Sequence, residues 1–245
     1  MFSNFTGIEP LNLVFAINAN GQDAKDNFDR MTNTITSIID SYGQRNIKYG
    51  LIVYGSTAVS RIQLTESFSN DEQLKNFVKM VQLVRSGADL PAALENAKEV
   101  FGGDIPKRRN VLVIMTDSKA TGDKTKMQPT ADELHDMRVK VITVAMGTES
   151  DQSELRPLSP KKDNSLEEDP EESPKQLGER IMKEAVKRKF YVLFVWLSEI
   201  KGLDLRFHCV KFMLCYIEAA LLNVYGLYAF SSVSPIVANA FSPQQ

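Results

Sequence analysis

Short apolar runs alternate with segments of helical spacing along this chain as far as about Lys187. An unbroken run of Val, Ile and Leu is typical of a strand buried on both faces, whereas apolar residues three and four apart mark one face of a helix. The predicted strands are 11–17, 47–54, 58–64, 110–116 and 139–146, and the predicted helices are 23–42, 70–81, 90–101, 129–137, 151–155 and 174–187.

This order of elements predicts an α/β fold, a doubly wound and mostly parallel sheet with helices on both faces. The run 58–64 follows a tight turn and alternates less regularly, so we expect it to pair antiparallel at one edge. The acidic, proline-bearing stretch 161–176 is predicted to be mostly loop, with at most a weak last edge strand. We assign residues 1–10 to an N-terminal extension and 11–187 to a single domain.

The composition changes abruptly after Lys187, and residues 188–245 form a hydrophobic C-terminal tail. Within it, 212–230 is long enough to cross a bilayer, although Glu218 near its middle would cost about 2.5–3.5 kcal/mol there. Three interpretations stay open: a membrane anchor or interfacial segment, a pair of hydrophobic helices packed on the domain, or sequence outside the evolved domain, such as translation beyond a splice boundary.

Composition and charge exclude several classes of protein. The net charge is −2 without a clustered Lys/Arg face, so the sequence gives no argument for a nucleic-acid partner. Both cysteines, Cys209 and Cys215, lie in the tail, which leaves the domain without a disulfide or a Cys-based zinc site. The two histidines, His135 and His208, are isolated and are expected to be surface residues.

The N-terminus has no convincing export signal, because no Lys or Arg precedes the apolar run 11–19 and Asn12 and Asn18 interrupt it. The tripeptide Asn4-Phe5-Thr6 fits the glycosylation acceptor pattern, which matters only for an exported chain. Asn4 is therefore a candidate glycosylation site.

The sequence carries none of the common catalytic motifs of α/β enzymes. It lacks Gly-x-Gly-x-x-Gly after the first strand, the Gly-x-x-x-x-Gly-Lys-Ser/Thr phosphate loop and the Gly-x-Ser-x-Gly nucleophile elbow. The acidic cluster 167–172 lacks the spacing of a calcium loop and is expected to be a solvated loop. We therefore predict that the protein is not an enzyme.

Three loops are predicted to meet at one edge of the sheet. Ligands of open α/β sheets bind outside the carboxyl ends of the strands, and the loops 18–22, 85–89 and 117–123 fall on that edge. The first follows the strand LNLVFAI, and the third begins with Asp117 directly after the strand NVLVIMT.

These loops, in this order and spacing, resemble a von Willebrand factor type A (vWA) domain, also called an integrin I-like domain, over about residues 11–187. Supporting similarities are IKYGLIVYG in the second strand, Ala93-Leu94 after the second loop, and VLVIMTDS. The resemblance implies a metal-ion-dependent adhesion site, in which Asp-x-Ser-x-Ser, a Thr and an Asp hold magnesium or manganese and a ligand carboxylate completes the coordination.

Matched position by position, four of the five expected ligands differ in this chain. Asn18, Asn20 and Gln22 stand in the first loop and Ala88 in the second, so that only Asp117 keeps the family residue. A hard divalent cation requires several oxygens with carboxylates among them. We therefore predict a degenerate site at Asn18, Asn20, Gln22 and Asp117 that needs no cofactor, with Mg²⁺ or Mn²⁺ binding as the alternative.

Without a metal, the carboxamides of this edge are expected to hydrogen-bond one another, Asp117 and nearby backbone groups, because buried polar groups must find partners. The resemblance implies a non-enzymatic protein–protein interaction or adhesion module of the extracellular-matrix type. Its expected ligand is a matrix or cell-surface protein, its expected location is extracellular or at the cell surface, and the tail leaves membrane association open. The alternative is an intracellular vWA scaffold subunit of a multi-protein complex.

Overall fold

The structure is a computed structural model that describes residues 9–103, 105, 107–159 and 164–187. The described residues all belong to the first of two units, Met1–Arg188 and Lys189–Gln245. The helices and strands follow the order β1 (Leu11–Asn18), α1 (Ala24–Tyr42), β2 (Ile47–Tyr54), β3 (Ala58–Ile62), α2 (Asp71–Met80), α3 (Leu90–Gly102), β4 (Arg109–Thr116), η1 (Lys124–Lys126), α4 (Met127–Asp136), β5 (Val139–Ala145), α5 (Gln152–Leu155), η2 (Arg156–Leu158), β6 (Ser165–Glu167) and α6 (Pro174–Val186). Asn4, the cysteines, His208 and the segment 212–230 lie outside the described residues.

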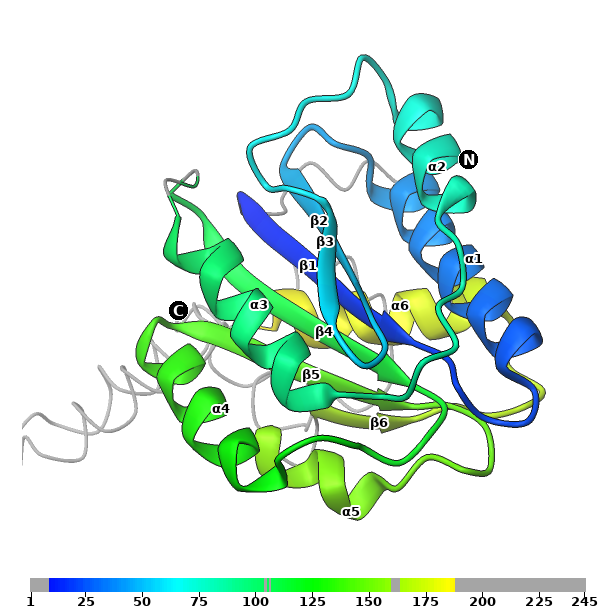
Figure 1. The fold of residues 1–245 in the computed structure, drawn as a ribbon. Helices are drawn as coiled ribbons and strands as arrows, with labels where there is room; N and C mark the ends of the chain where they lie inside the picture. Colours follow the sequence, from blue (N-terminus) through cyan, green and yellow to red (C-terminus); the bar gives the residue numbers. More distant parts are fainter. Residues whose placement is uncertain (1–8, 104, 106, 160–163, 188–245) are drawn as a thin grey trace, which may run out of the picture. The chain divides into compact units, whose positions relative to one another are not determined.

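The described strands form a six-stranded sheet in the order β3-β2-β1-β4-β5-β6 (Figure 1). All neighbouring strands pair parallel except β2 and β3, which pair antiparallel at one edge. The predicted α/β fold, mostly parallel with one antiparallel edge strand, is thus confirmed. Because β1 lies between β2 and β4, its carboxyl end is flanked by the ends of two parallel neighbours.

Each strand of the centre buries both of its faces. In β1, Leu13, Phe15 and Ile17 pack into a core with α1, α2 and α6, whereas Val14 and Ala16 pack into a second core with α3 and α4. This alternation follows from the two-residue period of a strand. Figure 1 shows α3 and α4 on one side of the sheet and α1 and α6 on the other. The doubly wound arrangement explains why β1 contains no charged residue and why β2, β4 and β5 contain one each, at or next to their first residue.

Side-chain caps stand at the start of several helices. Asn70 accepts a hydrogen bond from the backbone N–H of Gln73 at the start of α2. Asp89 does the same for Ala92 at the start of α3. Such caps satisfy N–H groups that have no partner within the helix. The caps fix where the helices start and therefore where the preceding loops end.

Two predicted boundaries are wrong by a few residues. The stretch before the predicted helix 129–137 ends in the short helix η1, and α4 begins at Met127 rather than at Pro129. The carboxylate of Asp123 caps this turn by accepting from the backbone N–H of Thr125, and proline is tolerated in the first turn that follows. The edge strand β3 ends at Ile62, two residues before the predicted end.

The acidic stretch contributes one short strand, as the sequence suggested. β6 pairs parallel with β5 over three residues. Arg30 of α1 forms an ion pair with Glu168, just beyond β6. This ion pair and the bond of Arg30 to the carbonyl of Glu172 tie the acidic loop to α1. Of the acidic residues next to β6, Glu168 and Glu172 thus take part in contacts within the domain.

Candidate functional site

Three loops meet at the carboxyl edge of the sheet, as their positions in the sequence predict. Asn18, the last residue of β1, donates to the carbonyl of Gly87 in the second loop, with 2.9 Å between Nδ2 and O. The backbone N–H of Asn20 donates to Asp117 in the third loop, with 2.8 Å between N and Oδ1. A fourth loop, after β5, joins them through Glu149, which accepts from the backbone N–H of Gln22 at 3.2 Å.

Asn18 is buried and uses its whole carboxamide. Its Nδ2 donates to the backbone carbonyls of Tyr54, at 2.6 Å, and Gly87. Its Oδ1 accepts from the hydroxyl of Ser118 at 3.2 Å. Only a nitrogen can face two carbonyl oxygens at these distances, so the surroundings fix which end of the amide points to the backbone. A carboxylate at this position would meet the same two carbonyls without a proton to share.

Gly87 connects the two asparagines of the first loop. Its carbonyl accepts from Asn18, and its N–H donates to Oδ1 of Asn20 at 3.2 Å. Its φ angle is +105°, a backbone conformation that favours glycine. Asn18 and Asn20 are therefore linked through this glycine rather than directly to each other, which corrects the expectation that the carboxamides bond one another.

Asp117 is also buried, and both of its oxygens face N–H donors. Oδ1 accepts from the backbone N–H groups of Asn20 and Gly21, and Oδ2 accepts from the carboxamide of Asn27 at 3.1 Å. A Cβ atom at Gly21 would lie 3.2 Å from the carbonyl oxygen of Asp117 and 3.3 Å from its Oδ2. The absence of a side chain at Gly21 therefore lets the first loop approach this carboxylate closely.

Gln22 takes a different place from the one expected. Its side chain is exposed and makes no hydrogen bond with the residues that the structure describes, and only its backbone N–H takes part in the network through Glu149. The expectation that its carboxamide bonds Asp117 is therefore wrong. The reason is geometric: the carboxylate of Asp117 is already surrounded by nearer N–H groups.

The second and third loops are joined around Ala88. Its N–H donates to the hydroxyl of Thr121 at 3.0 Å, and its carbonyl accepts from the N–H of Thr121 at 2.8 Å. Ala88 itself is buried and has no side-chain oxygen. Asp89, the neighbouring carboxylate, caps α3 through Oδ1. Oxygens of the Thr121 and Asp89 side chains thus already accept hydrogen bonds from the backbone N–H groups of Ala88 and Ala92.

Tyr54, at the end of β2, lies beneath this network. Burial raises the pKa of its hydroxyl, the carboxylate of Asp117 adds to the increase, and the hydroxyl of Thr116 opposes it. The hydroxyl is fully buried and makes no hydrogen bond of good geometry among the described residues, although Thr116 is near enough to affect its pKa. Tyr54 thus contributes its backbone carbonyl to Asn18 and its ring to the core.

Four residues of the network were not identified from the sequence as site residues: Asn27, Ser118, Thr121 and Glu149. Asn27 lies one turn into α1 and outside the apolar face of that helix. This position is the only local feature of the sequence that could have indicated its role. Ser118 follows Asp117 directly and could have been found by its position. Glu149 lies in a loop whose position depends on β5, so no local pattern indicates its role.

The residues of this edge do not fit a divalent cation. Mg²⁺ prefers an octahedron of oxygens with one or two carboxylates. Here the buried carboxylate of Asp117 is directed at three N–H donors, one of them the carboxamide of Asn27, and the carboxamide of Asn18 directs its nitrogen at two backbone carbonyls. Among the described residues, no group of three or more His, Cys, Asp or Glu side chains is placed to hold a metal ion.

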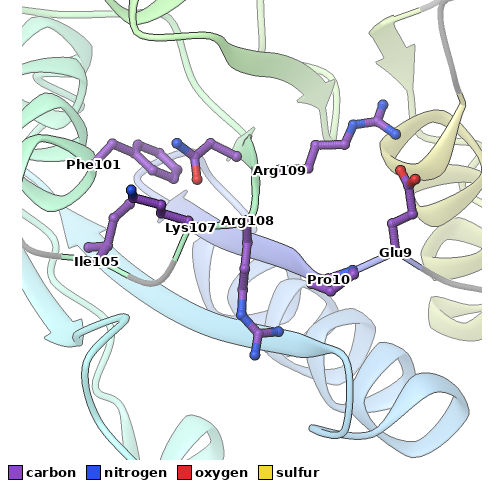
Figure 2. A pocket seen from close by; sticks show the side chains of 8 residues that line it. Glu9, Pro10, Phe101, Ile105, Lys107, Arg108 and Arg109 are labelled. Atoms are coloured by element: carbon purple, nitrogen blue, oxygen red, sulfur yellow. The ribbon is translucent and has the colours of Figure 1, made fainter.

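A cavity also lies at the opposite edge of the sheet, where β1 and β4 begin. Its volume is about 550 Å³, and Lys107, Arg108 and Arg109 line it. Figure 2 shows that the side chains of Arg108 and Arg109 point in different directions. Arg108 donates to the carbonyl of Asn46, and Arg109 donates to two carbonyls at the end of α6. The two guanidinium groups therefore bind backbone carbonyls instead of converging on a ligand.

The comparisons with known proteins agree on the fold. Residues 12–178 match the model of the von Willebrand factor type A domain. Among solved structures, the chain is similar to proximal thread matrix protein 1 from the mussel byssus with a zinc-occupied MIDAS motif, with a TM-score of 0.61 and 20% identity over 73% of this chain and 45% of that one.

Two bacterial structures are similar in the same way. A von Willebrand factor type A protein from Catenulispora acidiphila has a TM-score of 0.60 and 14% identity, over 74% of this chain and 42% of that one. An aerotolerance-related membrane protein from Bacteroides fragilis has a TM-score of 0.56 and 15% identity, over 73% of this chain and 98% of that one. The match to the mussel protein, at 45% of its length, spans less than half of that protein. Within the part of this chain that the structure describes, no helix is long and apolar enough to cross a membrane.

Proposed function

The chain belongs to the von Willebrand factor type A family, and on this premise we propose that it is a non-enzymatic protein-binding module of the adhesion and extracellular-matrix type. Domains of this family are generally interaction modules rather than enzymes. Its ligand is a matrix or cell-surface protein, and it binds that ligand without magnesium or manganese. The chain shares its fold with a matrix protein of the mussel byssus, and this similarity of fold supports an extracellular location.

One observation carries the metal-independent part of the proposal. The carboxylate of Asp117, the single family ligand that this sequence keeps, accepts three hydrogen bonds from Asn20, Gly21 and Asn27. A metal would have to replace these donors, and the amide of Asn18 would have to turn away from two backbone carbonyls. Buried donors and carbonyls left without partners cost about 1–3 kcal/mol each. The edge is therefore a closed hydrogen-bonded cap on the sheet.

The test is a binding experiment in which only the metal changes. The full-length protein is immobilised and presented with a panel of purified matrix proteins and cell-surface ectodomains, in magnesium, in manganese and in EDTA. A vWA domain with the intact Asp-x-Ser-x-Ser motif, bound to its own ligand, is the control that should respond to EDTA. We expect the same affinity in all three buffers for this chain. Binding that EDTA abolishes and either metal restores would contradict the proposal.

The compartment is tested separately. Protease protection of a tagged full-length chain in cells, with removal of any sugar at Asn4, distinguishes an extracellular module from an intracellular scaffold. Lumenal or extracellular exposure with sugar on Asn4 supports the proposal. A chain that is digested only after the plasma membrane is permeabilised, and that carries no sugar, supports the scaffold.

A further inference from the structure

A second surface of the domain has the properties of a peptide-binding groove. It is a cavity of about 270 Å³ between α1 and the segment Val81–Arg85, which follows α2. In Figure 1 this segment runs from α2 alongside α1 toward α3. We call it the α1–α2 groove; its apolar floor consists of Phe28, Val81 and Leu83, and its rim carries Lys25, Lys79 and Arg85.

The segment that borders the groove belongs to no helix or strand, and it leaves α2 at an extended residue, Val81. Val81 leaves α2 with φ −66° and ψ 131°, and the alternate residues Val81, Leu83 and Arg85 line the groove. Val84 points elsewhere, because its Cγ1 lies 3.1 Å from where a Cβ of Gly55 would be. Among the described residues, none forms a backbone hydrogen bond with the segment 82–85. Backbone groups without partners beside an apolar groove offer a template for another strand.

Exposed apolar side chains lie at the same end of α2. Met80 is 79% exposed, and it stands between Lys79 of the rim and Val81 of the floor in the sequence. Phe77, one turn earlier, is also exposed and packs edge-on against Phe68, with 5.8 Å between ring centroids. Large exposed apolar side chains next to an apolar groove are typical of interaction sites.

The charge of the rim indicates what kind of partner fits. Lys25, Lys79 and Arg85 are exposed, and the one carboxylate in the lining, Asp29, is bonded to Lys25 at 3.2 Å. The whole chain is slightly acidic, so this positive rim is a local feature. Charge complementarity selects a partner with carboxylates that flank an apolar side chain.

We propose that the α1–α2 groove binds an extended, acidic segment of a partner protein. The segment pairs as a short strand with 82–85, places an apolar side chain on Leu83 and Val81, and directs carboxylates at Lys79 and Arg85. This proposal rests on the proposed function as a protein-binding module, and it supplies a surface and a partner chemistry that lie away from the loops of the sheet edge.

The first experiment measures binding of two labelled peptides to the full-length protein by fluorescence anisotropy. The probe is Glu-Val-Glu-Leu-Glu-Val-Glu, and the control peptide has Lys in place of each Glu. We expect the acidic peptide to bind saturably, more weakly as salt is added, and the basic peptide not to bind. Equal binding of the two peptides, or no binding of either, would overturn the proposal.

Matched variants locate the site. The double variant Lys79→Glu/Arg85→Glu should weaken binding of the acidic peptide about tenfold, since it replaces two attractions by repulsions. The control Lys175→Glu/Lys183→Glu changes the net charge equally on the exposed side of α6 and should alter binding by less than about twofold. Circular dichroism verifies that both variants fold. An equal loss in the two variants would refute the placement.

Hydrogen–deuterium exchange tests the strand pairing. Amides of 82–85 should exchange more slowly when the acidic peptide is bound, whereas those of the loop 18–22 should not change. Unchanged exchange at 82–85 in saturated complex would refute the pairing. A chain that binds matrix proteins in the metal experiment but ignores the acidic peptide would refute only this inference. Peptide binding without any matrix ligand would instead contradict the proposed function.

Discussion

Replacing Asn18 by aspartate puts the family residue back at the first position of the loop, and we expect this change to destabilise the protein. The substitution is nearly isosteric, so packing is kept. The Nδ2 atom that donates to Tyr54 and Gly87 becomes an oxygen that faces two carbonyls at 2.6 and 2.9 Å. The charge would be buried without a partner, because the remaining contact is a single hydroxyl from Ser118.

The new Asp can be buried either as a charged carboxylate or as a neutral acid, and the size of the effect follows from the form that costs less free energy. The folded chain can protonate it, which at pH 7 costs about 4 kcal/mol for an Asp with an unfolded pKa of about 3.9. The neutral acid can restore one of the two lost hydrogen bonds, so about 1 kcal/mol is added for the other. We therefore expect Asn18→Asp to lose about 5 kcal/mol of stability at pH 7.

The pH dependence has a defined sign. The folded pKa of the new Asp is raised above its unfolded value, so folding takes up a proton between the two values and the variant loses stability as the pH rises. Near pH 4, where protonation costs little, the difference from the wild type should fall to about 1 kcal/mol. Urea unfolding of the full-length chain, followed by circular dichroism at both pH values, measures this difference.

The matched control is Asn20→Asp. Its Oδ1 accepts from the N–H of Gly87 and its side chain is exposed, so an aspartate keeps the bond and we expect a change within about 0.5 kcal/mol. Both variants are also unfolded with magnesium or manganese present. An Asn18→Asp variant as stable as the wild type at pH 7, or one that either metal restores to wild-type stability, would show that the edge accepts a cation after all.

Three further variants test other buried or partly buried side chains. Asp117→Ala leaves three N–H donors without an acceptor and should cost about 2–4 kcal/mol in urea unfolding, with no dependence on added magnesium. Tyr54→Phe removes a buried hydroxyl without a well-formed hydrogen bond, so its stability should stay within about 1 kcal/mol of the wild type; a larger loss would show that Thr116 is a true partner. In the wild type, interactions with Lys98 and Thr130 hold the carboxyl pKa of Glu95 below its usual value. Glu95→Gln loses these interactions, so the variant should be less stable than the wild type at neutral pH, and this difference in stability should disappear as acid protonates Glu95 in the wild type.

The order and type of the secondary structure could be predicted because the signals are local. The strand LNLVFAI and the strand NVLVIMT are apolar on both faces, and that pattern alone places them in the centre of a parallel sheet. Boundaries were less certain where polar residues make local contacts. Asp123 bonds Thr125 and starts the turn that leads into α4 two residues early, and no apolar period marks this contact.

The position of the candidate site could be predicted from the sequence, but its hydrogen-bond partners could not. Topology placed Asn18, Ala88 and Asp117 at one edge, because parallel strands end on the same side of the sheet. Which polar group bonds which depended on distances between loops. Gln22 was expected inside the network and is exposed, whereas Glu149, which the sequence did not single out, accepts from its N–H.

The sequence by itself therefore determined the α/β order, the buried strands and the edge at which the loops meet, since apolar periodicity and caps act within a few residues. Only the tertiary structure decided that Asn18 turns its nitrogen inward. The carbonyls that select this orientation belong to residues 36 and 69 positions away in the chain. Hydrogen bonds require distances near 3 Å, and such distances between remote loops exist only once the sheet and both layers of helices are assembled.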